Sequence, residues 1–145
     1  RLDSGRIENL IGRHPVDRKK MAIVERNGKL AITNWKVRGE TVKGEKVNAN
    51  DPFIRSPSLP LTSVIECRIE TGRTHQIRVH MASLGCPLIG DKVYGKQAAD
   101  RQLKPIPIRQ MLHAWKLTLY HPVKNEKMSF EAPIPEDIKV WLELD

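Results

Sequence analysis

The chain of 145 residues has few cysteines and no long apolar run. Cys67 and Cys86 are too few to staple a secreted domain or to complete a four-cysteine zinc site. No apolar stretch approaches the ~20 residues of a membrane helix, and the first residues do not resemble a secretory signal. These absences exclude a membrane-spanning protein and favour a cytoplasmic one with reduced thiols.

Acidic side chains are also in deficit. Lys and Arg number 25 against 17 Asp and Glu, which gives a net charge of +8 and a pI of about 9.7. The basic excess lies before residue 113, whereas residues 113–145 are net acidic. Such a surplus indicates a polyanionic partner, although a solvated basic surface without a partner gives the same sum. Aromatic residues make up only 5% of the chain, so few side chains are available for the bases of a single strand to stack on. Folded RNA is therefore the more natural partner.

The order of apolar runs and turn residues predicts a single α+β domain with a largely antiparallel, mixed sheet and a few helices. Asn27-Gly28 predicts a tight type I′ turn between two apolar runs, and hence a β-hairpin. Surface loops are expected near 41–60 and 96–109, where turn residues replace periodicity. The expected elements are a hairpin of 21–24 with 30–37, strands at 61–70, 111–120 and 128–130, and helices at 74–84 and from Pro135.

The segment from Thr71 to His80 combines a glycine break with an arginine and a predicted helix start. Thr74 is expected to cap a helix ending at Gly85, with Ile77, Met81 and Leu84 as its buried stripe. Free backbone N–H groups at a helix start favour an anion, and Gly72, Arg73, Thr74 and His75 surround that point. Arg78 lies one turn further on, away from the stripe. Alternatively, His75 and Arg78 form only a solvated helix face.

A second basic cluster precedes the predicted hairpin. It consists of Arg13, His14, Arg18, Lys19 and Lys20. Cations with a hydrogen-bonding imidazole suit a sugar–phosphate backbone, although the same residues also make a solubilising loop.

Metal and nucleophile signatures are weak. His75 and His80 are five residues apart, which on a helix is ~140° rather than the i, i+4 spacing that one ion requires. Structural roles are expected for His113 and His121. There is no Gly-x-Ser-x-Gly elbow, and neither cysteine lies in a catalytic signature. No metal site is predicted.

Several separated motifs together resemble the large-subunit ribosomal RNA pseudouridine synthases of the RluA/RluD type. The central match runs from Glu70 to Met81 and continues through Pro87–Asp91 and Tyr94-Gly95. The flanking matches are Ile11–Pro15, Lys20–Ala22, His113-Ala114, Leu117, His121-Pro122, Ala132–Pro135 and Asp137.

The resemblance implies that the parent enzyme isomerises specific uridines of ribosomal RNA to pseudouridine, without a metal or organic cofactor. In the family an aspartate attacks the nucleotide, and the target base leaves its stack to reach the site. Arg78 matches the arginine that holds this aspartate ionised and oriented. Gly72 and Arg73 would shape the pocket wall. Thr74, His75 and the basic cluster are predicted to contact RNA.

One departure concerns the nucleophile. The family carries it in a His-Arg-Leu-Asp motif, followed at a distance by a tyrosine segment that is missing here, although the chain opens with Arg1-Leu2-Asp3. We therefore expect residues 1–145 to be the C-terminal portion of the catalytic domain, inactive alone, with a possible edge-to-edge dimer through the incomplete sheet. The alternatives are that Asp3 is the nucleophile of a shortened enzyme, that the chain is a stand-alone RNA-binding module, or that it is a metal-dependent hydrolase.

Overall fold

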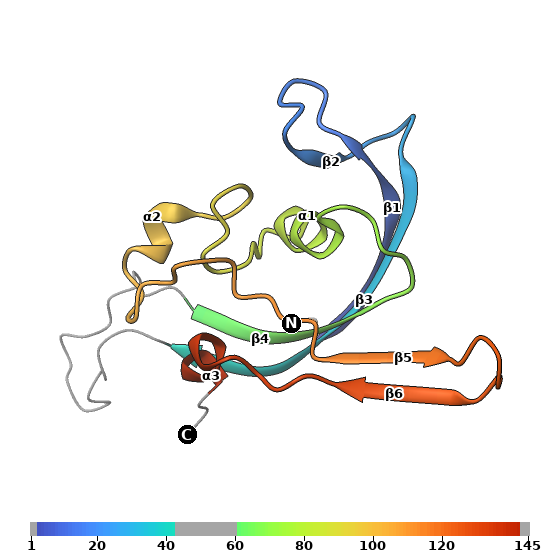
Figure 1. Cartoon of the computed structure of the whole chain (residues 1–145). Helices are drawn as coiled ribbons and strands as arrows, with labels where there is room; N and C mark the ends of the chain where they lie inside the picture. Colours follow the sequence, from blue (N-terminus) through green and yellow to red (C-terminus); the bar gives the residue numbers. More distant parts are fainter. Residues whose placement is uncertain (1–2, 43–60, 143–145) are drawn as a thin grey trace.

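The computed structural model describes residues 3–42 and 61–142, with three helices and six strands in those ranges (Figure 1). In chain order the elements are β1 (Ser4–Arg13), β2 (Met21–Ile23), β3 (Lys29–Val42), β4 (Leu61–Ile69), α1 (Gln76–Ser83), α2 (Gln97–Asp100), β5 (Lys116–Tyr120), β6 (Lys127–Glu131) and α3 (Glu136–Leu142). The α+β class and the antiparallel pairing predicted from the sequence are confirmed, because every strand pair described is antiparallel.

Four strands form one sheet in the order β2-β1-β3-β4. The sheet curves around α1, which lies against its inner face (Figure 1). Thr33 stands between Ile7 on one neighbouring strand and Ile69 on the other, and its side chain is fully buried under the helix. Ile11, Ala31 and Val79 form the core between sheet and helix.

The predicted hairpin of 21–24 with 30–37 is wrong. Both segments are strands, but β2 and β3 lie on opposite sides of β1 and pair with it rather than with each other. The sequence analysis did not predict β1, which provides the surface that each apolar run needs. Only Asn27 has a positive φ in the turn, at 59°, so the turn is not of type I′.

The predicted helix exists but starts later than expected. His75, rather than Thr74, occupies the N-cap position, and no side chain caps the helix. Gly85 ends it with a φ of +77°, as predicted. The predicted stripe is partly wrong: Met81 is buried but Leu84 is exposed, because the sheet covers the face that carries Gln76, Val79 and His80.

The remaining elements extend from this core. Strands β5 and β6 form a separate two-stranded hairpin that projects away from the curved sheet (Figure 1). Helix α3 follows the predicted start at Pro135 and buries Ile138 and Trp141. The loop expected at 96–109 contains α2 and the buried Leu103, so it is not wholly a surface segment. In the loop expected at 41–60, residues 41–42 end β3, and residues 43–60 lie outside the described residues. None of the described helices is long and apolar enough to span a membrane.

Candidate functional site

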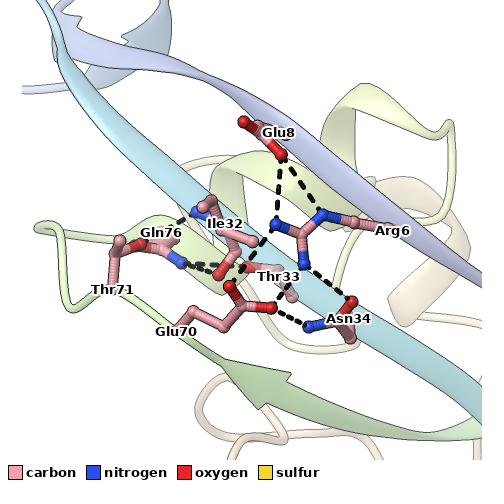
Figure 2. A network of polar contacts seen from close by, with 8 residues as sticks. All are labelled: Arg6, Glu8, Ile32, Thr33, Asn34, Glu70, Thr71 and Gln76. Carbon is pink, nitrogen blue, oxygen red and sulfur yellow. Dashed lines mark hydrogen bonds and ion pairs between the residues drawn. The ribbon is translucent and has the colours of Figure 1, made fainter.

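The turn between β4 and α1 is fixed by the side chain of Gln76, which is only 3% exposed. Its Nε2 donates to the carbonyl oxygen of Ile32 at 2.9 Å and to Oγ1 of Thr33 at 3.0 Å. Its Oε1 accepts from the Thr71 hydroxyl at 2.8 Å (Figure 2). The same oxygen accepts from the Arg73 amide at 3.0 Å. Because all these bonds come from one buried amide, the turn that presents residues 72–75 is tied directly to β3.

A second network holds the end of β4 on the face of the sheet opposite α1. Glu70 accepts hydrogen bonds from the Arg6 guanidinium and from Asn34 Nδ2, the latter at 2.8 Å (Figure 2). These two hydrogen bonds lower the pKa of the Glu70 carboxyl. Arg6 also donates to Glu8, so β1, β3 and the start of the turn are cross-linked by one guanidinium.

Arg78 forms a two-point ion pair with Asp91. Its Nε lies 2.7 Å from Oδ2, and one terminal nitrogen lies 2.8 Å from Oδ1. The Asp91 side chain is fully buried, and that of Arg78 is 12% exposed. Burial alone would raise the pKa of the Asp91 carboxyl, but hydrogen bonds from Arg78 and from the Tyr94 and Val93 amides outweigh it and leave the pKa lowered. Both members of the pair are therefore charged at neutral pH.

Tyr94 joins this pair to two other elements. Its ring lies under the Arg78 guanidinium, whose central carbon is 5.0 Å from the ring centroid. Its hydroxyl accepts the Met21 amide of β2 at 2.8 Å and lies 3.0 Å from Nδ1 of His75. His75 also packs edge-on against the ring.

The predicted residues Gly72, Arg73, Thr74 and His75 lie together at this point. The Arg73 Nε donates to the carbonyl oxygen of Leu30 at 2.8 Å. In the part of the chain that the structure describes, no carboxylate pairs with Arg73, in contrast to Arg78. A Cβ placed on Gly72 would meet nothing within 4 Å, so this side of the turn is open. An unpaired cation beside an open turn suits an anionic ligand.

The basic cluster forms the connection between β1 and β2. Arg13, Arg18 and Lys19 are exposed, and Lys20 is half-buried. The His14 Nδ1 accepts the backbone amides of Val16 and Asp17 at 3.2 and 3.0 Å, so this imidazole also shapes the loop. The loop leads directly into Met21, whose amide meets Tyr94, and it is thereby connected to the Arg78 pair.

His80 has a structural role. It is fully buried, with Nδ1 2.9 Å from the Thr33 hydroxyl and Nε2 3.0 Å from the Asn9 side-chain oxygen. Burial lowers the pKa of His80, which keeps the ring neutral. His121 accepts two turn amides through Nδ1. Within the described residues, no three His, Cys, Asp or Glu side chains gather in a way that could hold a metal ion.

Sequence reasoning missed two residues of this site, Asp91 and Tyr94. Asp91 and Tyr94 belong to the matches Pro87–Asp91 and Tyr94-Gly95, for which the sequence predicted no role in the site. The available signal was that the Arg78 guanidinium needs a partner if it is buried, and that Asp91 and Tyr94 offer a carboxylate and a hydroxyl shortly after it in the sequence. Asp3 is exposed, and its carbonyl oxygen accepts the Val37 amide at β1's start. Arg78 therefore pairs with Asp91 and not with Asp3 in this structure.

Comparisons with known proteins agree on one family. Residues 1–83 match the family model described as RNA pseudouridylate synthase. Over 140 residues the chain is 44% identical to ribosomal large subunit pseudouridine synthase D of Neisseria meningitidis serogroup A, covering 92% of this chain and 33% of that protein. It is 40% identical to the protein of that name from Pseudomonas aeruginosa, covering 95% of this chain and 39% of the relative.

A solved structure agrees with the fold. The human RNA pseudouridylate synthase domain containing 1 superposes with a TM-score of 0.65 at 28% identity, covering 91% of this chain and 49% of that one. The chain thus spans between about a third and two fifths of the curated relatives described above, and about half of the structural neighbour.

Proposed function

The chain belongs to the RNA pseudouridylate synthase family, and from that premise we propose that it serves the conversion of uridine to pseudouridine in ribosomal RNA. The observation that carries the proposal is the family match over residues 1–83, which include the turn and helix that bear Arg73 and Arg78. The relatives whose names specify a substrate class are named for the large ribosomal subunit. RNA is therefore the proposed partner.

In this proposal Arg78 orients the attacking aspartate. Asp91 occupies Nε and one terminal nitrogen of the guanidinium, which leaves the other terminal nitrogen for a second carboxylate. Asp91 thus holds the arginine in one orientation, and the arginine in turn stabilises the charged form of the attacker. We propose that this attacker lies in polypeptide outside the 145 residues, as the C-terminal portion of a catalytic domain would require.

RNA contacts are proposed for two surfaces that Tyr94 connects. Gly72, Arg73, Thr74 and His75 form the first, beside Arg78. The β1–β2 loop with its exposed cations forms the second, where charge neutralisation of phosphates supplies affinity without reading sequence.

The proposal is tested with a chimera. Residues 1–145 replace the matching segment of the Pseudomonas aeruginosa relative, and pseudouridine in large-subunit ribosomal RNA is measured by mass spectrometry in cells that lack their own enzyme. We expect pseudouridine to form, and Arg78→Ala to abolish it while Arg38→Ala, in an exposed ion pair, preserves it. A folded chimera that binds RNA but makes no pseudouridine would favour the second candidate, an RNA-binding module without catalysis, which the exposed basic loop also fits.

The isolated chain tests where the nucleophile lies. Incubated with uridine-containing ribosomal RNA, it is expected to make no pseudouridine. Turnover by the isolated chain that Asp3→Asn abolishes would instead assign the nucleophile to Asp3.

Two further parts of the proposal concern the state of the protein. A cytoplasmic location follows from a ribosomal RNA substrate and from the reduced thiols expected of Cys67 and Cys86. Strand β4 pairs with β3 alone among the described strands, so its other edge offers backbone groups to a second copy. Light scattering of the isolated chain is expected to show a dimer, and a strictly monomeric species would refute this part.

A further inference from the structure

We propose that Tyr94 is a positioning residue that holds His75 as a hydrogen-bond donor for a phosphate oxygen of the RNA backbone. This inference rests on the proposed function, since it names the group of the RNA that the turn binds. It adds a residue and a role that neither the motif nor the family comparison assigns.

The Tyr94 hydroxyl makes two hydrogen bonds, and the direction of one is fixed by its partner. The Met21 amide can only donate, so the phenolic oxygen accepts that bond at 2.8 Å. In the proposed arrangement the hydroxyl donates its one proton to His75 Nδ1, which lies 3.0 Å away. A neutral imidazole whose Nδ1 accepts carries its proton on Nε2, on the side of the ring away from Tyr94. The hydroxyl thus sets the tautomer of His75.

Burial and the charge of Arg78 favour the neutral form of the His75 ring. Arg78 on α1 and Asp91 with Tyr94 on the 91–94 segment are the titratable groups that face it. Burial lowers the pKa of His75, the positive charge of Arg78 lowers it further, and Asp91 opposes both. A second proton would also have to enter Nδ1, where the Tyr94 hydroxyl already points its own. The ring is therefore a neutral donor at physiological pH.

The donor belongs to a residue with an unusual backbone conformation at the turn. His75 has a φ of 56°, a left-handed conformation that is uncommon for a residue with a Cβ and that its surroundings here stabilise. The surroundings are the Gln76 hydrogen bonds on one side and the Tyr94 contact on the other. The side chain is half-buried, and among the described residues Nδ1 has a hydrogen-bond partner whereas Nε2 has none.

The same turn carries the cation that selects the ligand. Arg73 has no carboxylate partner in the described part of the chain, whereas Arg78 is paired with Asp91. A guanidinium and a neutral N–H donor two residues apart match a phosphate oxygen, which is anionic and accepts hydrogen bonds only. Tyr94 also accepts the Met21 amide of β2, so its side chain contacts both the end of the basic β1–β2 loop and this phosphate site.

The first test measures the tautomer directly. In the 15N-labelled chain, two-bond NMR correlations are expected to show His75 protonated at Nε2 and not at Nδ1, with its signals assigned by loss in His75→Gln. In Tyr94→Phe, which keeps the ring under Arg78, we expect a tautomer mixture and a His75 pKa closer to the ordinary value. Tyr120→Phe is the matched control, because Tyr120 is 64% exposed on the projecting hairpin. A His75 protonated at Nδ1 in the unsubstituted chain would overturn the proposal even if Tyr94→Phe does not fold.

The second test measures binding of a short uridine-containing RNA stem-loop. Tyr94→Phe and His75→Gln are each expected to weaken binding roughly tenfold, the equivalent of one hydrogen bond to a charged group, and the double variant no further. Additive losses, or unchanged binding in either single variant, would refute the phosphate contact. Neither test needs turnover, so an inactive chimera with the expected tautomer would refute the proposed function alone.

Discussion

Removing one partner of the Arg78–Asp91 ion pair is expected to destabilise the fold strongly. In Arg78→Ala the fully buried Asp91 carboxylate keeps only the amides of Val93 and Tyr94 as donors. A buried charge that loses its partner costs ~3–5 kcal/mol, a large share of the ~5–15 kcal/mol that a domain possesses. Asp91→Asn still accepts both amides, and water can reach the slightly exposed Arg78, so its expected loss is smaller, about 2 kcal/mol.

Urea unfolding followed by far-ultraviolet circular dichroism and tryptophan fluorescence measures these losses. The pKa of Asp91 is lower in the folded chain than its unfolded value of ~3.9. A lowered carboxyl pKa stabilises the fold above the unfolded value, and this contribution disappears as the pH falls through the folded value. The difference between the unsubstituted chain and Asp91→Asn should therefore be constant from about pH 5 to 8 and shrink below about pH 4.

Glu131→Gln is the matched control. It makes the same chemical change in the Lys116–Glu131 pair, whose side chains are 46% and 57% exposed. Surface pairs of this kind contribute at most ~1 kcal/mol. If Asp91→Asn costs no more than Glu131→Gln, or if its cost does not change in acid, the buried pair does not stabilise the fold as argued. Should Arg78→Ala not fold, Asp91→Asn still decides the question.

Three further predictions concern other parts of the chain. At pH 8 iodoacetamide should modify the exposed Cys86 much faster than Cys67, since burial and then Glu66 raise the Cys67 pKa to about 11 and leave about one thiolate in a thousand; peptide mass spectrometry would show equal rates if this is wrong. Arg73→Ala should lower the slope of log affinity for RNA against log salt by about 1, and an unchanged slope would remove this residue from the phosphate contacts. Gly90→Ala should cost about 2 kcal/mol or more in urea unfolding, because φ is +72° and a Cβ would lie 2.0 Å from a carbonyl oxygen; native-like stability would contradict that geometry.

Local sequence patterns predicted the elements in which the spacing of apolar residues is regular. A strand was predicted at 61–70 and β4 spans Leu61–Ile69, and a helix was predicted from Pro135 and α3 begins at Glu136. Strand β1 was missed because Asn9, a polar residue, takes an inward position to bind His80, which interrupts the alternation. Without β1, the two runs that flank it in the sheet looked like partners of each other.

The candidate site shows the same division. Gly72, Arg73, Thr74 and His75 are neighbours in sequence, so their proximity needed no tertiary information. The Thr74 cap was wrong because His75 occupies the N-cap position, and the Gln76 amide, which a Thr74 cap would bind, donates to the Arg73 carbonyl oxygen at 3.0 Å. The pairing of Arg78 with Asp91 depends on how the segment after α1 folds back, and that segment has no periodicity from which contacts can be read.

The connection from Arg13 to Met21 depends on the register of β2 more than on the identity of its exposed residues. Pairing of β1 with β2 closes at Arg13 and Met21, and the next contact is the Met21 amide on Tyr94. A shift of β2 by one residue along β1 would turn that amide away from Tyr94, since neighbouring residues of a strand point to opposite sides. The exposed lysines and arginines of this loop can therefore be exchanged without altering the Tyr94 contact, whereas a register shift of β2 would separate the loop from Tyr94.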